Sequence, residues 1–248
     1  MIFITGDVHA DFRRFNKNSF YEQTETTKDD YLIICGDFGI WDDSPRERYE
    51  LDILNARSFT TLFVTGNHSN YDLLATLPVS EWHGGKVQFI RDSVIHLMRG
   101  QMYDICGNKF FTMGGASSHD ISDGILEPDD PFFKTKQREL DMRNALYRIN
   151  HKTWWKEELP SDEEYQTAIN TLEANDWKTD YIITHCLPTN VANEVGRGLY
   201  THDRLTDFLE EITQRCEFRH LFCGHYHINR IVMDKYVVLY EQIVRLNP

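Results

Sequence analysis

Long apolar runs are missing from this 248-residue sequence. A membrane-spanning helix needs about 20 consecutive apolar residues, and no stretch approaches that length. Met1 leads directly into a short apolar segment, without the basic region and cleavage site of a secretory signal. We therefore expect a protein with neither a membrane span nor a signal peptide.

Cysteine is also scarce: the chain has five, widely spaced, with no C-x-x-C pair. Cys35, Cys186 and Cys223 lie on or beside apolar segments, where thiols are typically buried and unreactive. An odd number without a spacing motif does not indicate a disulfide framework. We expect reduced thiols and a cytoplasmic protein, because cytosolic proteins rarely carry disulfides.

Positive charge is the third shortage. Lys and Arg number 26 against 39 Asp and Glu, which gives a formal net charge of −13. An acidic surface repels phosphate backbones and so disfavours non-specific binding of nucleic acids. Bound divalent cations would reverse the sign locally, so a small anionic substrate is still compatible with this composition.

Five short apolar segments are each followed closely by side chains that can bind a metal ion. The segments are residues 2–5, 31–35, 61–65, 181–184 and 220–223. The side chains that follow them are Asp7, His9, Asp37, Asn67, His68, His185, His225 and His227. In α/β sheets, functional groups gather beyond the carboxyl ends of the strands, so we expect these side chains to meet.

Two carboxylates, one amide oxygen and five imidazoles are more ligands than the four of a closed zinc site. They suit two metal ions that share a bridging carboxylate. Two-metal sites with ions about 3.5–4 Å apart catalyse displacement at phosphorus. Nitrogen and oxygen ligands without thiolate favour manganese, iron, zinc or cobalt.

The order of the elements predicts two packed sheets. Helices at 44–59, which begins with the capping pair Ser44-Pro45, and at 70–77 separate the first three strands and indicate parallel pairing. Further strands are predicted at 87–90, 94–98, 101–105, 109–113 and 236–240. About ten strands are too many for one open sheet covered by helices, which favours two sheets with helices outside.

The second half contains a segment of different character. Residues 117–159 are charged and irregular, and we interpret them as an insertion, helical from about 135 to 148, within a single domain of residues 1–248. Ser161 and Glu164 form a capping box for a helix that ends near 175. Residues 190–199 are predicted to be a mobile loop, and residues 201–216 an amphipathic helix.

The motifs occur in a specific order: D-x-H, G-D, G-N-H, a lone strand-end histidine, and G-H-x-H. In this order they resemble the calcineurin-like metallophosphoesterase superfamily, over residues 7 to 227. The resemblance implies an α/β fold, a four-layer αββα sandwich of two mixed β-sheets flanked by helices. It also implies hydrolysis of a phosphoester by metal-activated water.

The resemblance further implies roles for individual residues. Two divalent ions, manganese being the first expectation, would be bound by seven ligands: Asp7, His9 and His227 on the first ion, Asn67, His185 and His225 on the second, and Asp37 as the bridge. Asn67 and His68 would contact the substrate. His68 would protonate the leaving alkoxide, a contribution of about 10²–10⁴ in rate.

Two departures from the family pattern concern the substrate. Ser69 stands where members usually carry Asp or Glu, and the G-D motif lacks the later Asp and Arg of protein Ser/Thr phosphatases. The carboxylate that would orient His68 is therefore open between Asp42, Asp43 and Asp72. With two histidines in its last motif, the chain is more similar to the phosphodiesterase-type branches. We expect a small phosphodiester or nucleotide substrate, with a phosphoprotein phosphatase or a metal-binding scaffold without turnover as alternatives.

Some polar and aromatic residues outside the motifs have a second interpretation. Ser118, His119 and Asp120 could line the pocket, but a solvated loop is the favoured interpretation. Trp154 and Trp155 could stack on a base, but anchoring the insertion is favoured. Arg148, Lys152 and Arg197 could contact a phosphate, and they are the least favoured candidates of this group.

Overall fold

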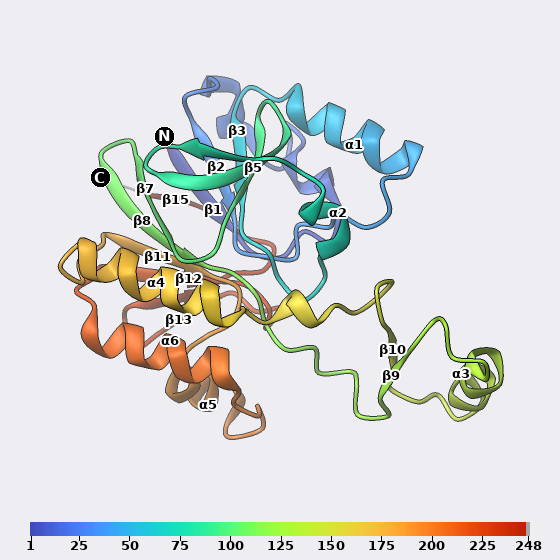
Figure 1. Cartoon of the computed structure of the whole chain (residues 1–248). Helices are drawn as coiled ribbons and strands as arrows, with labels where there is room; N and C mark the ends of the chain where they lie inside the picture. Colours follow the sequence, from blue (N-terminus) through green and yellow to red (C-terminus); the bar gives the residue numbers. More distant parts are fainter. Residues whose placement is uncertain (247–248) are drawn as a thin grey trace.

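The computed structural model describes residues 1–246, so the last two residues of the predicted domain 1–248 lie outside the described part. Two large sheets form its centre (Figure 1). The first has seven strands in the order β15-β1-β2-β3-β6-β5-β4. In that order they are Ile243–Leu246, Ile2–Thr5, Tyr31–Ile34, Thr60–Phe63, Val94–Leu97, Gly85–Arg91 and Val79–Trp82. The inner strands β1, β2, β3 and β6 are parallel, and β15, β5 and β4 pair antiparallel.

The second sheet has six strands in the order β13-β14-β12-β11-β8-β7. In that order they are Arg230–Val232, Tyr236–Val238, His220–Cys223, Tyr181–Thr184, Asn108–Met113 and Gln101–Ile105. The four inner strands are parallel, and the two edge strands are antiparallel to their neighbours. Both sheets are therefore mixed, as expected from the sequence.

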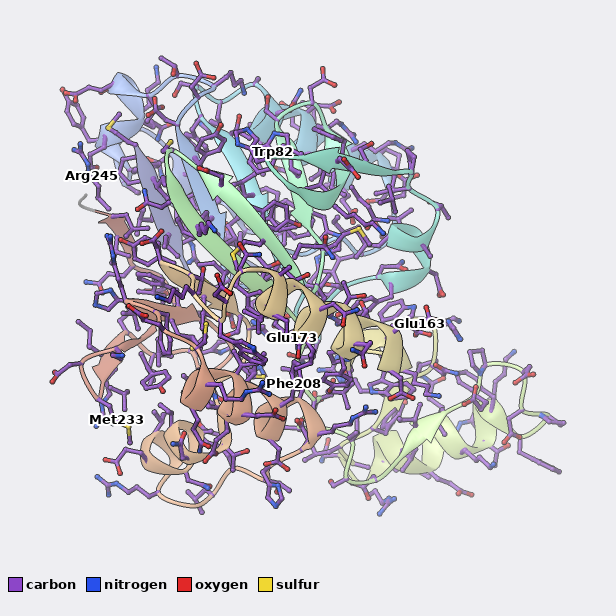
Figure 2. The ribbon with its side chains drawn as sticks, turned by 60° about the vertical axis from the view of Figure 1, so that its left-hand side comes forward. Trp82, Glu163, Glu173, Phe208, Met233 and Arg245 are labelled. Atoms are coloured by element: carbon purple, nitrogen blue, oxygen red, sulfur yellow. The ribbon has the colours of Figure 1, made fainter. Side chains whose placement is uncertain are left out.

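Helices cover the outer face of each sheet. The first is covered by α1 (Pro45–Asn55), α2 (Tyr71–Ala75) and the 3₁₀ segments η1 (Phe12–Phe15) and η2 (Tyr21–Glu25). The second is covered by α4 (Asp162–Ala174), α5 (Thr189–Gly196) and α6 (Arg204–Arg215). Figure 2 shows α4 and α6 side by side, with Glu173 and Phe208 labelled, and the ring of Phe208 lies 4.7 Å from that of Tyr165.

Three hydrophobic clusters correspond to the three interfaces of a four-layer sandwich. In β1, Ile2 and Ile4 belong to the cluster between the sheets, whereas Phe3 belongs to the cluster under α1. Alternate side chains of one strand thus enter different apolar layers. Strands buried on both faces have continuous apolar sequences, which explains why the central strands could be predicted. The four-layer αββα prediction is confirmed.

The segment 117–159 lies outside the two large sheets. It contains β9 (Ile125–Leu126), α3 (Phe133–Met142), β10 (Arg148–Ile149) and η3 (Lys156–Glu158), and it projects from one end of the body (Figures 1 and 2). Strands β9 and β10 pair only with each other. The predicted helix at 135–148 was too long, because the chain leaves α3 at Met142 and returns to pair with β9.

Trp155 fixes this segment to the body. Its side chain is 2% exposed, and its indole N–H donates to Oδ2 of Asp72 at 2.8 Å. The anchoring interpretation is thus confirmed for Trp155.

The predicted loop at 190–199 is wrong, because residues 189–196 form α5. Val191 and Ala192 of α5 are buried against the second sheet, and this packing outweighs the weak helix propensity of the sequence. The helix ends at Arg197, whose φ of 52° is left-handed. The Ser44 cap and the Ser161–Glu164 capping box are confirmed. Across residues 1–246, no helix combines the length and apolar character needed to cross a membrane.

Candidate metal centre

The predicted site residues follow strands of both sheets, and polar contacts join these strand ends. The amide of Gly115, after β8, donates to the carbonyl of Thr65, after β3, at 2.8 Å. The amide of His225, after β12, donates to Oδ1 of Asp7, after β1, at 2.8 Å. The two sheets therefore present their carboxyl ends to one common site, as the strand-end pattern predicted.

A first group of donor atoms consists of Asp7, His9 and His227, which the structure brings within 4.8 Å of one another. Oδ2 of Asp7 lies 2.9 Å from Nε2 of His227 and 3.8 Å from Nε2 of His9. This oxygen is buried and has no hydrogen-bond partner among the described residues. The histidine side chains are 31% and 51% exposed, for His9 and His227 respectively, so this group faces solvent.

A second group consists of Asp7, Asp37 and His185, all buried. Nε2 of His185 lies 3.3 Å from Oδ2 of Asp37 and 3.3 Å from Oδ1 of Asn67, which adds the amide oxygen to the group. The other ring nitrogen, Nδ1, donates to the carbonyl of Cys35 at 2.8 Å. That bond turns Nε2 toward the carboxylates, in the way that outer partners orient metal-binding histidines.

Asp37 belongs to the second group, and one of its oxygens also faces the first group. Its Oδ2 is 3.3 Å from Nε2 of His185 and 3.8 Å from Nε2 of His9. Its Oδ1 accepts a hydrogen bond from the backbone amide of His68 at 2.8 Å. Asp37 therefore faces a histidine of each group, as Asp7 also does, while its second oxygen fixes the turn that carries His68.

Glycines beside these side chains leave them the necessary room. A Cβ at Gly66 would lie 2.1 Å from Oδ1 of Asp37, and a Cβ at Gly224 would lie 2.0 Å from Oδ1 of Asp7. Both distances are far below any van der Waals contact, so each motif glycine makes space for a carboxylate. The glycines of G-N-H and G-H-x-H thus have a packing role.

Four of the predicted ligands have left-handed backbone conformations. The φ angles are 48° for His9, 44° for Asp37, 69° for His225 and 51° for His227. Such conformations cost residues other than glycine roughly 1–2 kcal/mol each. Eleven other non-glycine residues of the described chain also have positive φ, so this conformation does not by itself mark the site.

The charges of the site suit a cation. Burial alone lowers the pKa of His185, but the charges of Asp37 and Asp7 outweigh it and raise that pKa to about 9. Burial lowers the pKa values of His9 and His225, which favours the neutral imidazole that metal ions require. Two buried carboxylates, together with the imidazoles of His9 and His225 that burial keeps neutral, form a donor set that fits divalent metal ions.

His68 is half-buried at the edge of the site. Its ring centroid lies 5.3 Å from that of His9 and 6.0 Å from that of Trp41. Within the described chain, none of the three aspartates considered as its partner forms a hydrogen bond with it. Instead, Asp42 bonds to Ser44, Asp43 bonds to Arg48, and Asp72 bonds to His151 and Trp155.

His225 belongs to neither donor group. Its Nε2 lies 2.7 Å from Nε2 of His119, a residue that the sequence placed in a solvated loop. His119 does lie in an exposed loop, and the segment after β8 also brings it into contact with the site, which was the less favoured interpretation. Asp120, the next residue, accepts a hydrogen bond from Nε of Arg148 at 2.9 Å. At His68, burial lowers the pKa, the charge of Asp37 raises it and the charge of Arg148 lowers it. The net effect is a lowered pKa. No strand-end motif marks His119. The sequence offered it as a less favoured candidate for lining the pocket, and its position in space reveals the contact with His225.

Carboxylates and imidazoles gathered at the strand ends of a four-layer sandwich form a candidate metal centre. The family model for calcineurin-like phosphoesterases matches residues 1–229, and the chain belongs to this family. It is therefore a metal-dependent phosphoric ester hydrolase, and its family generally binds two divalent metal ions. A search of curated proteins found no match to the chain.

Proposed function

We propose that this protein hydrolyses a small phosphodiester or nucleotide at a centre of two divalent metal ions. The observation that carries the proposal is the position of Asp37, whose Oδ2 faces His9 at 3.8 Å and His185 at 3.3 Å. A carboxylate that faces donors of both groups suits a pair of neighbouring cations.

The proposed ligands follow these groups in part, and His225, which lies outside both groups, is assigned from the resemblance, with its ring 4.9 Å from that of His185. The first ion is assigned to Asp7, His9 and His227, the second to Asn67, His185 and His225, and Asp37 bridges them. When bound, the two ions supply Lewis-acid stabilisation of the phosphoryl oxygens and a nucleophilic water. We propose manganese as the metal, with iron, zinc and cobalt compatible with the same donors.

His68 is assigned the proton transfer to the leaving alkoxide. Its backbone is fixed by the hydrogen bond from its amide to Asp37, and its ring lies beside that of His9. This places an imidazole at the exposed side of the centre, where a substrate would enter. Asn67, directly before it, is assigned a second contact to the substrate.

The proposed substrate class follows from the sequence and from the shape of the surface. An open groove of about 680 Å³ adjoins the first donor group. Its lining includes His9, Trp41, two arginines (Arg13 and Arg46) and four carboxylates (Asp11, Asp42, Glu47 and Glu50). This volume suits a small ligand. Arg13 is paired with Asp11, so the charge of the groove does not by itself select a phosphate-bearing ligand. The G-D motif lacks the Arg of protein Ser/Thr phosphatases, which supports small phosphoesters over phosphoproteins.

The test compares two chromogenic substrates side by side, a nitrophenyl phosphodiester and a nitrophenyl phosphomonoester. Protein stripped of metal by a chelator is assayed before and after addition of manganese. Manganese-dependent turnover with preference for the diester supports the proposal. Preference for the monoester contradicts the diester assignment, and the absence of turnover with two ions bound favours a scaffold.

The remaining proposals concern organisation and location. We propose that the chain forms one domain with an insertion at 117–159, because both sheets contribute residues to one site. We also propose a cytoplasmic location. All five cysteines are unpaired, and four of them are buried, which suits a reducing compartment.

A further inference from the structure

The contact between His119 and His225 links the insertion to the metal centre. Their Nε2 atoms lie 2.7 Å apart, and their ring centroids are 4.7 Å apart. A hydrogen bond of this kind needs one imidazole to donate and the other to accept. This is the sole side-chain hydrogen bond of His225 within the described residues.

The residues on either side of His119 are held by the far end of the insertion. The amide and the hydroxyl of Ser118 donate to the carboxylate of Glu158 at 2.8 and 2.6 Å, and Glu158 is 3% exposed. On the other side, Asp120 is paired with Arg148. His119 therefore belongs to an anchored segment, although its own side chain is exposed.

A metal-binding histidine offers one ring nitrogen to the ion and the other to a partner that orients the ring. In His185 the partner is the carbonyl of Cys35, at 2.8 Å from Nδ1. For His225, the corresponding partner is His119, which offers an imidazole nitrogen where Cys35 offers a carbonyl oxygen.

We propose that His119 is a positioning residue for the metal ligand His225. Nε2–H of His225 donates to Nε2 of His119, which leaves Nδ1 of His225 as the nitrogen for the ion. The inference rests on the proposed function, since it takes His225 to be a ligand of the second ion. It also gives the insertion a role: Glu158 and Arg148 hold the residues on either side of His119, and His119 orients His225.

The experiment measures manganese binding to the chelator-treated full chain by calorimetry. His119→Phe keeps a flat ring but removes the acceptor, and His119→Gln keeps an acceptor. His202→Phe serves as the matched control, because His202 is exposed and bonds to Asp207. Should the phenylalanine disturb the fold, as judged by circular dichroism, His119→Ala provides the same comparison.

We expect His119→Phe to weaken the binding of one manganese ion by about 10–100-fold, the usual effect of removing an orienting partner. In His119→Phe, binding of the other ion should stay at the wild-type level. His202→Phe should keep both affinities, and His119→Gln should keep most of its affinity. Unchanged binding in His119→Phe would overturn the inference. Equal losses in the Phe and Gln variants would overturn it too, because His119 would then bind the ion itself.

The wild-type protein separates this inference from the proposed function. Two bound ions in the wild type, with unchanged affinities in His119→Phe, reject the inference and leave the two-metal proposal standing. A wild type that binds only one ion rejects the two-metal proposal, and the inference with it.

Discussion

Gly224 packs directly against the carboxylate of Asp7. A Cβ at position 224 would lie 2.0 Å from Oδ1 of Asp7, and the next residue, His225, donates its backbone amide to the same oxygen at 2.8 Å. Asp7 follows a strand of the first sheet and Gly224 a strand of the second. The G-H-x-H motif therefore holds a proposed ligand of the other sheet in addition to supplying its own histidines.

Gly224→Ala is expected to displace the Asp7 carboxylate and to weaken metal binding by more than about 10-fold, because Asp7 belongs to both donor groups. The measurement is metal content after dialysis against limiting manganese. Gly107→Ala is the control. A Cβ at position 107 would meet nothing within 4 Å, so Gly107→Ala should not disturb metal binding. Because Gly107 has a φ of +75°, the alanine should cost about 1 kcal/mol of stability. Equal metal content in both variants would contradict the packing argument.

Asp37→Asn removes one negative charge from the carboxylate between the two donor groups. We expect the loss of at least one of two ions, and a fall in turnover of more than about 100-fold, larger than the usual effect of losing an outer partner. Metal analysis and steady-state kinetics measure both. Asp42→Asn, at an exposed carboxylate on the same loop, should retain metal and activity. Retention of two ions with full activity in Asp37→Asn would exclude the bridging role.

His68→Ala is expected to reduce hydrolysis of esters with alkoxide leaving groups by about 10²–10⁴, with unchanged metal content. Nitrophenolate leaves without protonation, so nitrophenyl esters should lose much less activity. The ratio of these two losses is the measurement. A uniform loss on both kinds of ester would show that His68 binds the substrate but does not transfer the proton.

His96 gives the stability of the fold a dependence on pH. It is 7% exposed, its Nδ1 lies 2.8 Å from Oε1 of Gln88, and its Nε2 has no partner in the described chain. Burial, together with the charge of Arg99, lowers its pKa to about 3. Between about pH 6.5 and 3 the unfolded chain therefore binds a proton that the folded chain does not. His96 should lower the free energy of unfolding by about 1.4 kcal/mol for each pH unit of acidification in this window.

Urea unfolding of metal-free protein at pH 6.5, 5.5 and 4.5 tests this dependence. His96→Gln should lose less stability on acidification than the wild type does. His83→Gln, at an exposed histidine, should follow the wild type. Parallel losses in all three proteins would mean that His96 is not the titrating group.

The sequence predicted the parts of the fold whose side chains are buried on both faces. Strands β1, β2, β3, β11 and β12 have continuous apolar sequences because each lies between two apolar layers. Strands β4, β13 and β15 were missed, since they lie at sheet edges and most of their residues are exposed or half-buried. The helix α5 was missed because its stability comes from packing that local sequence does not reveal.

The site residues likewise divide into those that the sequence could place and those that it could not. Asp7, Asp37, Asn67 and His185 could be placed because the glycines and apolar strands around them form a local pattern. His119 could not be placed, because its significance depends on a contact with a residue 106 positions away. The orientation of His225 toward His119 was likewise beyond what the sequence could predict.

Titration of metal-free protein with manganese, while hydrolysis of a nitrophenyl phosphodiester is followed, tests the central claim most directly. The account predicts that turnover is absent without metal and reaches its maximum only after two equivalents have bound. Full activity without metal, or a plateau after one equivalent, would contradict a centre of two ions joined by Asp37.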